Sequence, residues 1–373
     1  MAHPADCPEL SVIVPTLNEA GALPRLLECL AAQQDVNLEV IVGDGGSDDG
    51  TPEDALKQAR ISGMRLLVAR ETANRGRQMN AAAAVSSSCT LLFLHADSSF
   101  EDRFALRAAL DVLAERIAVC GHERVAGHFS LRFSRSDASY PLGYYYYERK
   151  ARLNRRECIH GDQGFLMRRA FFDLAGPYEE ALPMLAETRL AEVVRREGEW
   201  LLLPGEIGTS ARRFETEGFR ERQTLNAILM NFAALRWEPF FREFPLIYRR
   251  QMDTSRLCLS RLLEGTGSLI KTLPFRQRLS LWYATGAYVR ENAWQLAFFL
   301  DVLRDFHRGT PAGKGAEQLL DFYDRRIDHL IDNAGARLTT AFLVWLWFQA
   351  VRLTARMGEK SLPPVPPGNG GRR

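Results

Sequence analysis

The segment at residues 90–98, TLLFLHADS, limits what this chain can fold into. Residues 91–94 form a continuous apolar run that ends abruptly at His95-Ala96-Asp97. A run this short, apolar on both faces, is typical of a central strand in a parallel sheet covered by helices. Ligands of such sheets bind beyond the carboxyl ends of the strands, and the run predicts the carboxylate of Asp97 at that edge.

Asp97 has two interpretations. A carboxylate at a strand end can hold a divalent cation, and the cation can hold a diphosphate. Alternatively, Asp97 or Ser98 belongs to a surface turn or caps the next helix. The segment alone favours the turn or cap, so the choice depends on the rest of the N-terminal half.

Three further runs, at 11–15, 38–42 and 65–69, have the composition of strands, and each leads through a loop into a helical segment. The loop at 43–51, GDGGSDDGT, is a tight turn at the end of the second run. Strand, loop and helix thus alternate four times with short connections. This alternation predicts a doubly wound α/β domain.

Composition narrows the functional classes. The chain of 373 residues is 46% hydrophobic and 25% charged, which is ordinary for a soluble globular protein. Its net charge of +2 gives no reason to expect nucleic acid as a partner. Six scattered cysteines without a CxxC pair predict reduced thiols in a cytoplasmic protein. The first residues lack the pattern of a signal peptide, and none is expected.

From about residue 218 the sequence is typical of helix almost to the end. We expect a first domain at 1–254, a helical domain at 255–360 and a Pro/Gly-rich disordered tail at 361–373. The longest nearly uncharged apolar stretch, 338–351, is too short to span a bilayer. Within it, 342–348 is FLVWLWF, which is apolar all round and must be buried or lie at a membrane surface.

Six motifs follow one another in order: SVIVPTLNEAG, VGDGGSDDGT, NRGRQMNAA, FLHADS, HGDQGFLMRR and TSARRFE. With them, residues 10–215 resemble a family 2 glycosyltransferase of the GT-A fold. The resemblance is strongest to the bacterial subfamily associated with radical-SAM/selenobiology gene clusters. It implies an α/β, GT-A-type doubly wound mixed sheet with a C-terminal all-helical extension. It also implies an inverting enzyme that transfers a sugar from a nucleoside-diphosphate sugar to an acceptor hydroxyl, with a divalent metal.

The resemblance implies a donor site along the strand ends. In relatives the loop after the first strand contacts the nucleoside, and the residue equivalent to Asp44 hydrogen-bonds the base. An Asx turn is the alternative role of Asp44. Residues 75–77 precede a helix N-terminus, which favours phosphate, although an isolated Arg there is ordinarily a solvated surface charge. The implied donor-binding residues are Pro15, Leu17, Glu19, Asp44, Arg75, Gly76, Arg77, His95, Asp97, Arg212 and Arg213.

Two motifs depart from the family pattern. The metal motif is HAD, so His95 replaces the first Asp of the common DxD. Three roles for His95 stay open: contact with the ribose, contact with the metal, or packing alone. The resemblance implies that Asp97 holds Mg²⁺ or Mn²⁺, with the donor phosphates and waters supplying the other ligands. The second departure is Ala186-Glu187, where the family usually has Glu-Asp. Glu187 keeps a carboxylate at the position of the general base, one methylene longer.

Glu187 also has an alternative role, as a first-turn acid that stabilises its helix by about 0.3–1 kcal/mol. Asp162 and Gln163 are implied to face the acceptor, and Arg212 and Arg213 to meet the diphosphate, where developing charge needs fixed cations. Two other functions stay open. A nucleotidyltransferase would want a basic, Gly-rich loop near the first strand, and TLNEAGAL is not one. A non-catalytic nucleotide-sugar-binding or scaffold protein is compatible with both departures.

The helical region raises the hypothesis of peripheral membrane contact. Segment 219–250 has an apolar face flanked by arginines, including Arg249 and Arg250, and Trp345 and Trp347 are followed by Arg352 and Arg356. Basic residues beside Trp suit the headgroup boundary. Many members of the family use lipid-linked acceptors, so we expect the cytoplasm, with the inner membrane face as a further hypothesis. In the alternative, the apolar stripes pack together as a helical bundle.

Overall fold

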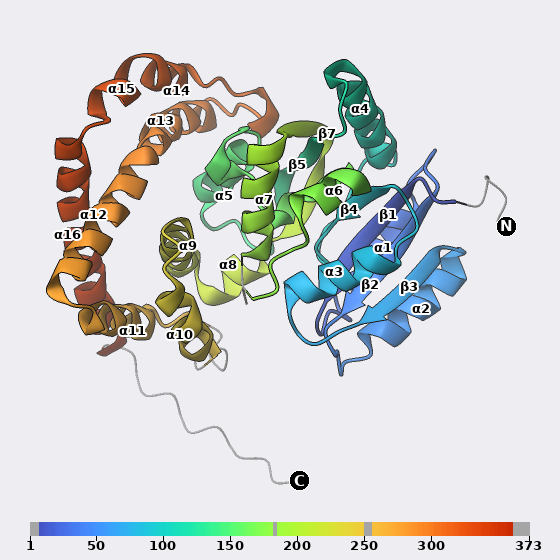
Figure 1. Ribbon diagram of the computed structural model, residues 1–373, viewed down its shortest axis with the longest axis horizontal. Coiled ribbons are helices and arrows are strands. Elements are labelled where there is room, and N and C mark those ends of the chain that lie inside the picture. The colour runs from blue at the N-terminus through green and yellow to red at the C-terminus, as the bar shows by residue number, and fades with distance from the viewer. Residues whose placement is uncertain (1–6, 182–184, 250–255, 361–373) are drawn as a thin grey trace, which may run out of the picture. The chain divides into compact units, whose positions relative to one another are not determined.

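The computed structural model describes residues 7–181, 185–249 and 256–360. Its N-terminal part contains one seven-stranded sheet of order β3-β2-β1-β4-β6-β5-β7 with helices on both faces (Figure 1). The strands are β1 (Leu10–Thr16), β2 (Leu38–Asp44), β3 (Arg65–Arg70), β4 (Thr90–Phe93), β5 (Val125–Ser134), β6 (Phe165–Arg168) and β7 (Glu199–Ser210). The predicted central strand, β4, is the middle strand of the sheet.

The sheet is mixed because one strand runs against its neighbours. Strands β3, β2, β1 and β4 pair in parallel, whereas β6 pairs antiparallel with both β4 and β5. The helices of this part are α1 (Leu23–Ala31), α2 (Thr51–Ser62), α3 (Arg75–Val85), α4 (Ala105–Cys120), α5 (Pro141–Lys150), α6 (Arg169–Ala175) and α7 (Ala186–Glu197). The predicted α/β fold, a mixed sheet followed by a C-terminal helical region, is confirmed.

Two apolar cores explain the uninterrupted apolar runs of the strands. Val12 and Leu92 point into a cluster with residues of α1 and α4, whereas Ile13 and Phe93 point into another with residues of α3 and α7. Both sets of side chains are buried. The sheet is therefore covered on both faces, and only its strand ends and connecting loops are available for polar chemistry.

The chain divides into two compact units, and the predicted domain bounds stay a prediction. One unit runs to Arg212 and includes Val302–Gly315, and the other comprises Arg213–Asp301 and the chain from Ala316 onward. The predicted boundary at 254/255 falls partly within 250–255, outside the described residues, as does the predicted tail at 361–373. Helix α9 carries an apolar stripe that packs on α12, which explains why it belongs with the later helices.

The second unit is all-helical in its described residues. Its helices are α8 (Arg212–Glu217, which starts at the junction), α9 (Phe219–Ala234), α10 (Glu238–Arg249), α11 (Leu259–Thr272), α12 (Phe275–Glu291), the first part of α13 (Trp294–His307), α14 (Gln318–Phe322), α15 (Asp328–Ile331) and α16 (Ala334–Lys360). A π-helical turn, Tyr323–Ile327, joins α14 to α15. The end of α13 returns to the first unit, where Asp305 forms a buried ion pair with Arg149 of α5.

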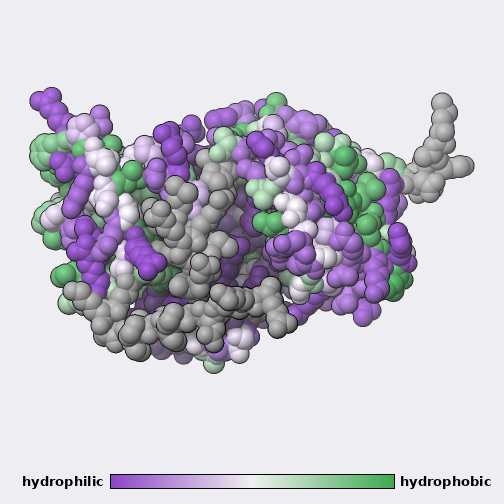
Figure 2. Space-filling view, turned by 90° about the horizontal axis from the view of Figure 1, so that it is seen from below, coloured by the Kyte–Doolittle hydropathy of each residue, from purple (hydrophilic) through white to green (hydrophobic). Residues whose placement is uncertain are grey.

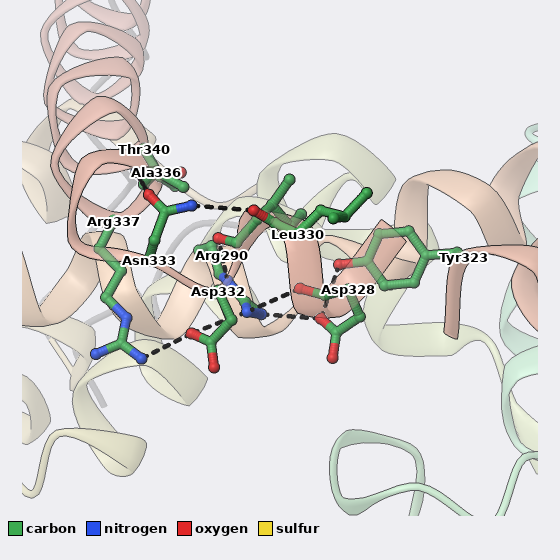
Figure 3. Close-up of polar contacts among 10 residues, drawn as sticks. Arg290, Tyr323, Asp328, Leu330, Asp332, Asn333, Ala336, Arg337 and Thr340 are labelled. Atoms are coloured by element: carbon green, nitrogen blue, oxygen red, sulfur yellow. Dashed lines mark hydrogen bonds and ion pairs between the residues drawn. The ribbon is translucent and has the colours of Figure 1, made fainter. Parts of the chain in front are cut away.

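Arg290, near the end of α12, is the polar centre of the second unit, which we call the helical unit (Figure 3). Its guanidinium contacts Asp328 Oδ1 and Asp332 Oδ1, each at 2.9 Å, and its Nε donates to the carbonyl oxygen of Ile331 at 3.0 Å. Asp332 also pairs with Arg337 of α16, and the hydroxyl of Tyr323 donates to Asp328. One buried side chain thus links α12 to the segment that leads into α16.

Candidate active site

Helix α3 is fixed tightly to the carboxyl ends of β1 and β2. The side-chain amide of Gln78 donates to the carbonyl oxygens of Thr16, at 2.6 Å, and Gly43, at 2.9 Å. A Cβ on Gly43 would lie 2.5 Å from the backbone oxygen of Gln78, so only glycine permits this approach. The first turn of α3 is therefore held at the edge where ligands of such sheets bind.

Two asparagines of the NRGRQMN motif anchor the loop that precedes α7. Asn74 caps α3 by accepting from the N–H of Arg77 at 3.0 Å, and its amide donates to the carbonyl oxygen of Glu180 at 2.9 Å. Asn80 exchanges two hydrogen bonds with the backbone of Tyr178, at 2.9 and 3.0 Å. The start of α3 and the approach to α7 are consequently held together.

Three side chains from different elements meet at this edge. Arg75, the first residue of α3, contacts Glu187 through its Nη1 and the carboxylate Oε1 at 3.1 Å. His95, two residues beyond β4, contacts both, with its Nε2 3.2 Å from Arg75 Nη1 and 3.4 Å from Glu187 Oε1. Residues far apart in the sequence thus form one charged cluster, which we call the Glu187 cluster.

Glu187 is enclosed by the loop that the sequence assigned to the acceptor. Glu187 is only 8% exposed and lies in the first turn of α7. A Cβ on Gly161 would lie 2.6 Å from Glu187 Cγ, so the HGDQG loop lies directly against the carboxylate side chain. The helix-stabilising role of a first-turn acid is also compatible with this position.

The charges around Glu187 control its protonation. Burial alone raises the pKa of its carboxyl, but the adjacent Arg75 charge and the contact with His95 outweigh this effect and hold the pKa well below its ordinary value. The carboxylate is therefore ionised at neutral pH. It is also a weak base while Arg75 remains paired with it.

Asp97 and Glu19 add negative charge near the same arginine. Both carboxylates raise the pKa of Arg75 electrostatically, although its burial acts in the opposite direction. Asp97 is half-buried and makes no hydrogen bond to any residue that the structure describes. Among the described residues no group of three His, Cys, Asp or Glu side chains forms a ready-made metal site. One available carboxylate fits a cation that takes most of its ligands from a bound diphosphate.

The loops after β1 and β2 form a compact, hydrogen-bonded structure. The carboxylate of Asp44 accepts from the backbone N–H groups of Gly46 and Ser47 at 3.0 and 3.1 Å, and from the Ser47 hydroxyl at 2.5 Å. Asp44 thus makes the Asx-type turn of the alternative interpretation, and its contact with a base stays a prediction. Pro15 is buried within β1, whereas Leu17 is exposed just beyond it.

The remaining predicted donor residues have differing environments. Gly76 packs against the carbonyl of Glu179, which a Cβ would approach to 3.1 Å. Arg77 points to Glu180, with its Nε 3.3 Å from Oε2. Arg212 is exposed, and its Nη2 lies 3.9 Å from Glu19 Oε2. Arg213 begins the second unit, so its predicted contact with the diphosphate stays a prediction.

The two predicted acceptor residues differ sharply. The side chain of Gln163 is interior, with the residue 1% exposed, and its amide donates to the carbonyl oxygens of Ala151 and Phe129 and contacts His128. It therefore shapes the loop, and this placement gives no support to direct acceptor contact. Asp162 differs because its Oδ1 is buried with no hydrogen-bond partner in the described residues.

Sequence reasoning missed the residues that hold the site together. Asn74, Gln78 and Asn80 position α3 and its neighbours, and a run of amide side chains around a helix start was the available signal. Tyr178 was also missed. It is buried beside Glu187, and its hydroxyl has no hydrogen-bond partner within the described residues. Nothing in its local sequence indicated that position, because the contact depends on the fold.

Comparison with known proteins identifies the family. The model of Glycosyl transferase family 2 matches residues 11–174. Proteins described as PGL/p-HBAD biosynthesis glycosyltransferases, from Mycobacterium tuberculosis and Mycobacterium bovis, are 33% identical over 183 residues, which cover 48% of this chain and 67% of each relative. The chain belongs to glycosyltransferase family 2, and its enzyme class is glycosyltransferase.

Solved structures of low sequence identity are also similar. A mannosyltransferase, PcManGT from Pyrobaculum calidifontis, in complex with GDP-Man and Mn²⁺, has a TM-score of 0.47 and 17% identity, covering 95% of this chain and 89% of its own. S. aureus TarS in complex with UDP-GlcNAc has a TM-score of 0.44 and 16% identity, covering 81% of this chain and 92% of its own.

Proposed function

We propose that the protein is an inverting glycosyltransferase that moves a sugar from a nucleoside-diphosphate sugar to an acceptor hydroxyl. The observation that carries the proposal is the Glu187 cluster, a buried carboxylate 3.1 Å from Arg75 at the edge of the sheet. A base and a cation so close together suit a reaction in which one oxygen loses a proton while another gains negative charge.

Glu187 is the proposed general base. Its carboxylate takes the proton of the acceptor hydroxyl as that oxygen forms a bond to the anomeric carbon of the sugar. The bond between the anomeric carbon and the diphosphate oxygen breaks, and its electron pair leaves with the nucleoside diphosphate. Attack from the face opposite the leaving group inverts the anomeric configuration. Gly161, packed against Glu187, keeps the HGDQG loop beside the reacting hydroxyl.

Arg75 has two successive ion-pair partners in this scheme, Glu187 and the diphosphate of the donor. In the protein without substrate it neutralises Glu187 and keeps it weakly basic. A bound diphosphate offers Arg75 a stronger anionic partner. If the Arg75 side chain moved from Glu187 to the diphosphate, the pKa of the Glu187 carboxyl would rise. Donor binding would thereby activate the base. His95, which contacts both groups, would keep Glu187 oriented during the exchange.

Asp97 is the residue we propose to hold Mg²⁺ or Mn²⁺. When bound, the cation would supply positive charge against the departing diphosphate. The carboxylate of Asp97 has no hydrogen bond within the described residues and lies within electrostatic range of Arg75, which supports this assignment. The proposed donor site further includes Pro15, Leu17, Glu19, Asp44, Gly76, Arg77, Arg212 and Arg213, on the family resemblance.

The acceptor we propose is a hydroxyl compound, lipid-linked, that contacts Asp162. Free thiols at all six cysteines support a reducing, cytoplasmic location. Exposed apolar side chains on α16 support peripheral contact with the inner face of a membrane. We also propose membership of the subfamily associated with radical-SAM/selenobiology gene clusters, for which the HAD and NRGRQMN motifs are the support.

A donor screen tests the proposal. Calorimetry with UDP-, GDP- and dTDP-sugars, with and without Mn²⁺, should find one nucleotide that binds with strong metal dependence. Hydrolysis of that donor, measured by release of nucleoside diphosphate, separates an enzyme from a scaffold that only binds. Release of pyrophosphate from a nucleoside triphosphate and sugar phosphate would instead indicate a nucleotidyltransferase. Binding without turnover over a broad panel of hydroxyl acceptors would contradict the proposal.

A further inference from the structure

The last helix of the protein presents apolar side chains to solvent along most of its length. Residues Ala334–Met357 of α16 are long and apolar enough to cross a membrane by length and composition, yet only 11% of their most apolar window is buried. Six large apolar residues on one stripe are 39% to 63% exposed. They form what we call the apolar face: Leu338, Phe342, Trp345, Leu346, Leu353 and Met357.

One side of α16 packs against neighbouring helices, so the helix is not a free-standing span. Gly286 of α12 leaves no room for a Cβ, which would lie 2.5 Å from Ala341, so the two helices approach closely there. The rings of Trp282 and Phe348 are 5.6 Å apart, and Arg356 pairs with Glu264 of α11. Because α16 is fixed on one side by its neighbours, only its outer side can meet another apolar phase.

Helix α12 extends the exposed apolar surface. Gly286 contacts Ala341 and Trp282 contacts Phe348, so the two helices run antiparallel, and the start of α12 lies toward the end of α16. Phe275 and Leu279 of that start are both more than half exposed. In Figure 2 hydrophobic residues reach the surface among hydrophilic ones at the left-hand edge of the view, over the helical unit.

Cations outnumber carboxylates beside the apolar face, where Asp332 and Glu264 pair with Arg337 and Arg356. Segments 271–283 and 334–357 contain no Asp or Glu. They carry Lys271, Arg276, Arg278, Arg337, Arg352 and Arg356. Lys271 and Arg276 are exposed and make no ion pair with a described residue. Exposed cations next to an apolar surface complement a layer whose headgroups are anionic and whose interior is hydrocarbon.

We propose that the apolar face docks on a bilayer that contains anionic lipid, with α16 lying in the plane of the headgroup boundary. Trp345, a partly exposed member of the apolar face, has the amphipathic ring that favours this boundary. The exposed stripe far exceeds the isolated apolar residues that are normal on a soluble surface. This inference deepens the proposed membrane contact, and it is independent of the transfer chemistry.

Vesicle co-sedimentation of the full chain tests the proposal. At low salt the protein should pellet with vesicles of phosphatidylcholine and phosphatidylglycerol, and several-fold less with phosphatidylcholine alone. High salt should reduce binding to the anionic vesicles several-fold. The fluorescence of the protein should shift to shorter wavelength on binding, as Trp345 leaves water.

A matched pair of variants locates the contact. Combined Phe342→Gln, Trp345→Gln and Leu346→Gln should reduce vesicle binding at least tenfold, while nucleoside diphosphate binding in solution stays unchanged. The control combines Ile61→Gln and Val119→Gln, which remove apolar residues of the first unit that are even more exposed and should leave vesicle binding intact. An unchanged circular dichroism spectrum and urea midpoint would show that the helical unit of the triple variant is folded. Unchanged nucleotide binding keeps failure of docking distinguishable from failure of the proposed chemistry.

Two results would overturn the docking proposal. One is a wild-type chain that stays in the supernatant with anionic vesicles at low salt. The other is a wild-type chain that forms a stable dimer, seen by light scattering after gel filtration, and does not bind vesicles, while the triple variant is monomeric. In that case a second copy of the chain covers the apolar face.

Discussion

The two units of this protein, the first or sheet unit and the second or helical unit, place their apolar and charged residues in opposite ways. In the sheet unit the strands are covered on both faces, and charge gathers at one edge, where Arg75, His95 and Glu187 meet. In the helical unit the arginine at the centre of the main charge cluster, Arg290, is buried, whereas large apolar residues of α16 are exposed. A charged edge on a covered core is suited to binding a polar ligand. Exposed apolar helices over a polar anchor are suited to a surface contact.

Glu187→Gln should have the largest effect on the sheet unit. Glutamine keeps the size of the side chain but cannot accept a proton at neutral pH, so transfer should fall by about 10²–10⁴-fold. Donor affinity, measured by calorimetry, should change little. Glu192→Gln on the same helix is the matched control and should retain activity. Transfer within a few-fold of wild type would mean that Glu187 only stabilises α7.

Asp97→Asn should abolish the metal dependence of donor binding and leave the fold intact. The residue lies just beyond a buried strand and is not itself part of the core, and asparagine is a close match in size. Calorimetry with nucleoside diphosphate, with and without Mn²⁺, measures the effect, and circular dichroism checks the fold. If the mutant keeps the metal dependence of the wild type, the cation is held elsewhere.

Gly161→Ala sharpens the view that the HGDQG loop positions Glu187. The added methyl would overlap the Glu187 side chain, whose Cγ lies 2.6 Å from the Cβ position. A displacement of about 1 Å at the base should reduce turnover by roughly 100-fold with little change in donor affinity. Gly21→Ala, which meets open space, is the control and should keep near-normal turnover. Equal turnover in both variants would contradict this positioning role.

Arg290→Met tests the polar anchor of the helical unit. It removes the partner of Asp328 and Asp332, which are about half exposed and can regain water, so we expect a loss of about 1–3 kcal/mol of stability. Urea unfolding should show the loss, and donor binding at low urea should be unaffected. A matching loss of donor affinity in folded protein would mean that the two units act together.

The smallest expected effect concerns pH and the sheet unit. Arg116 makes two contacts of 2.7 Å with Glu199, which lower the pKa of that carboxyl from 4.5 to about 2. The pair therefore contributes stability above pH 4.5, and the contribution is lost as the pH falls toward 2. Glu199→Gln should lower the urea midpoint slightly at pH 6 and have less effect at pH 3. An equal effect at both pH values would contradict the ionic origin.

Much of the sheet unit was determined by local sequence. The apolar runs at 11–15, 38–42 and 91–94 predicted strands, because strands buried on both faces need uninterrupted apolar side chains. The run at 65–69 predicted a fourth strand, which forms the more exposed edge of the sheet. The motifs then indicated the strand ends as the site. Sequence alone could not show that Gln163 is interior, because its burial depends on contacts with Phe129 and Ala151 from other elements.

The tertiary structure decided the contacts between distant residues. Glu187 and Arg75 are separated by 112 positions, and their ion pair exists because Asn74 and Asn80 bind the 178–180 backbone. The sequence determined that 342–348 is apolar all round, but both a buried and an exposed helix satisfy that pattern. Packing against α12 covers Ala341 and Phe348 and leaves Phe342 and Trp345 exposed, because one neighbouring helix can cover only one side of another.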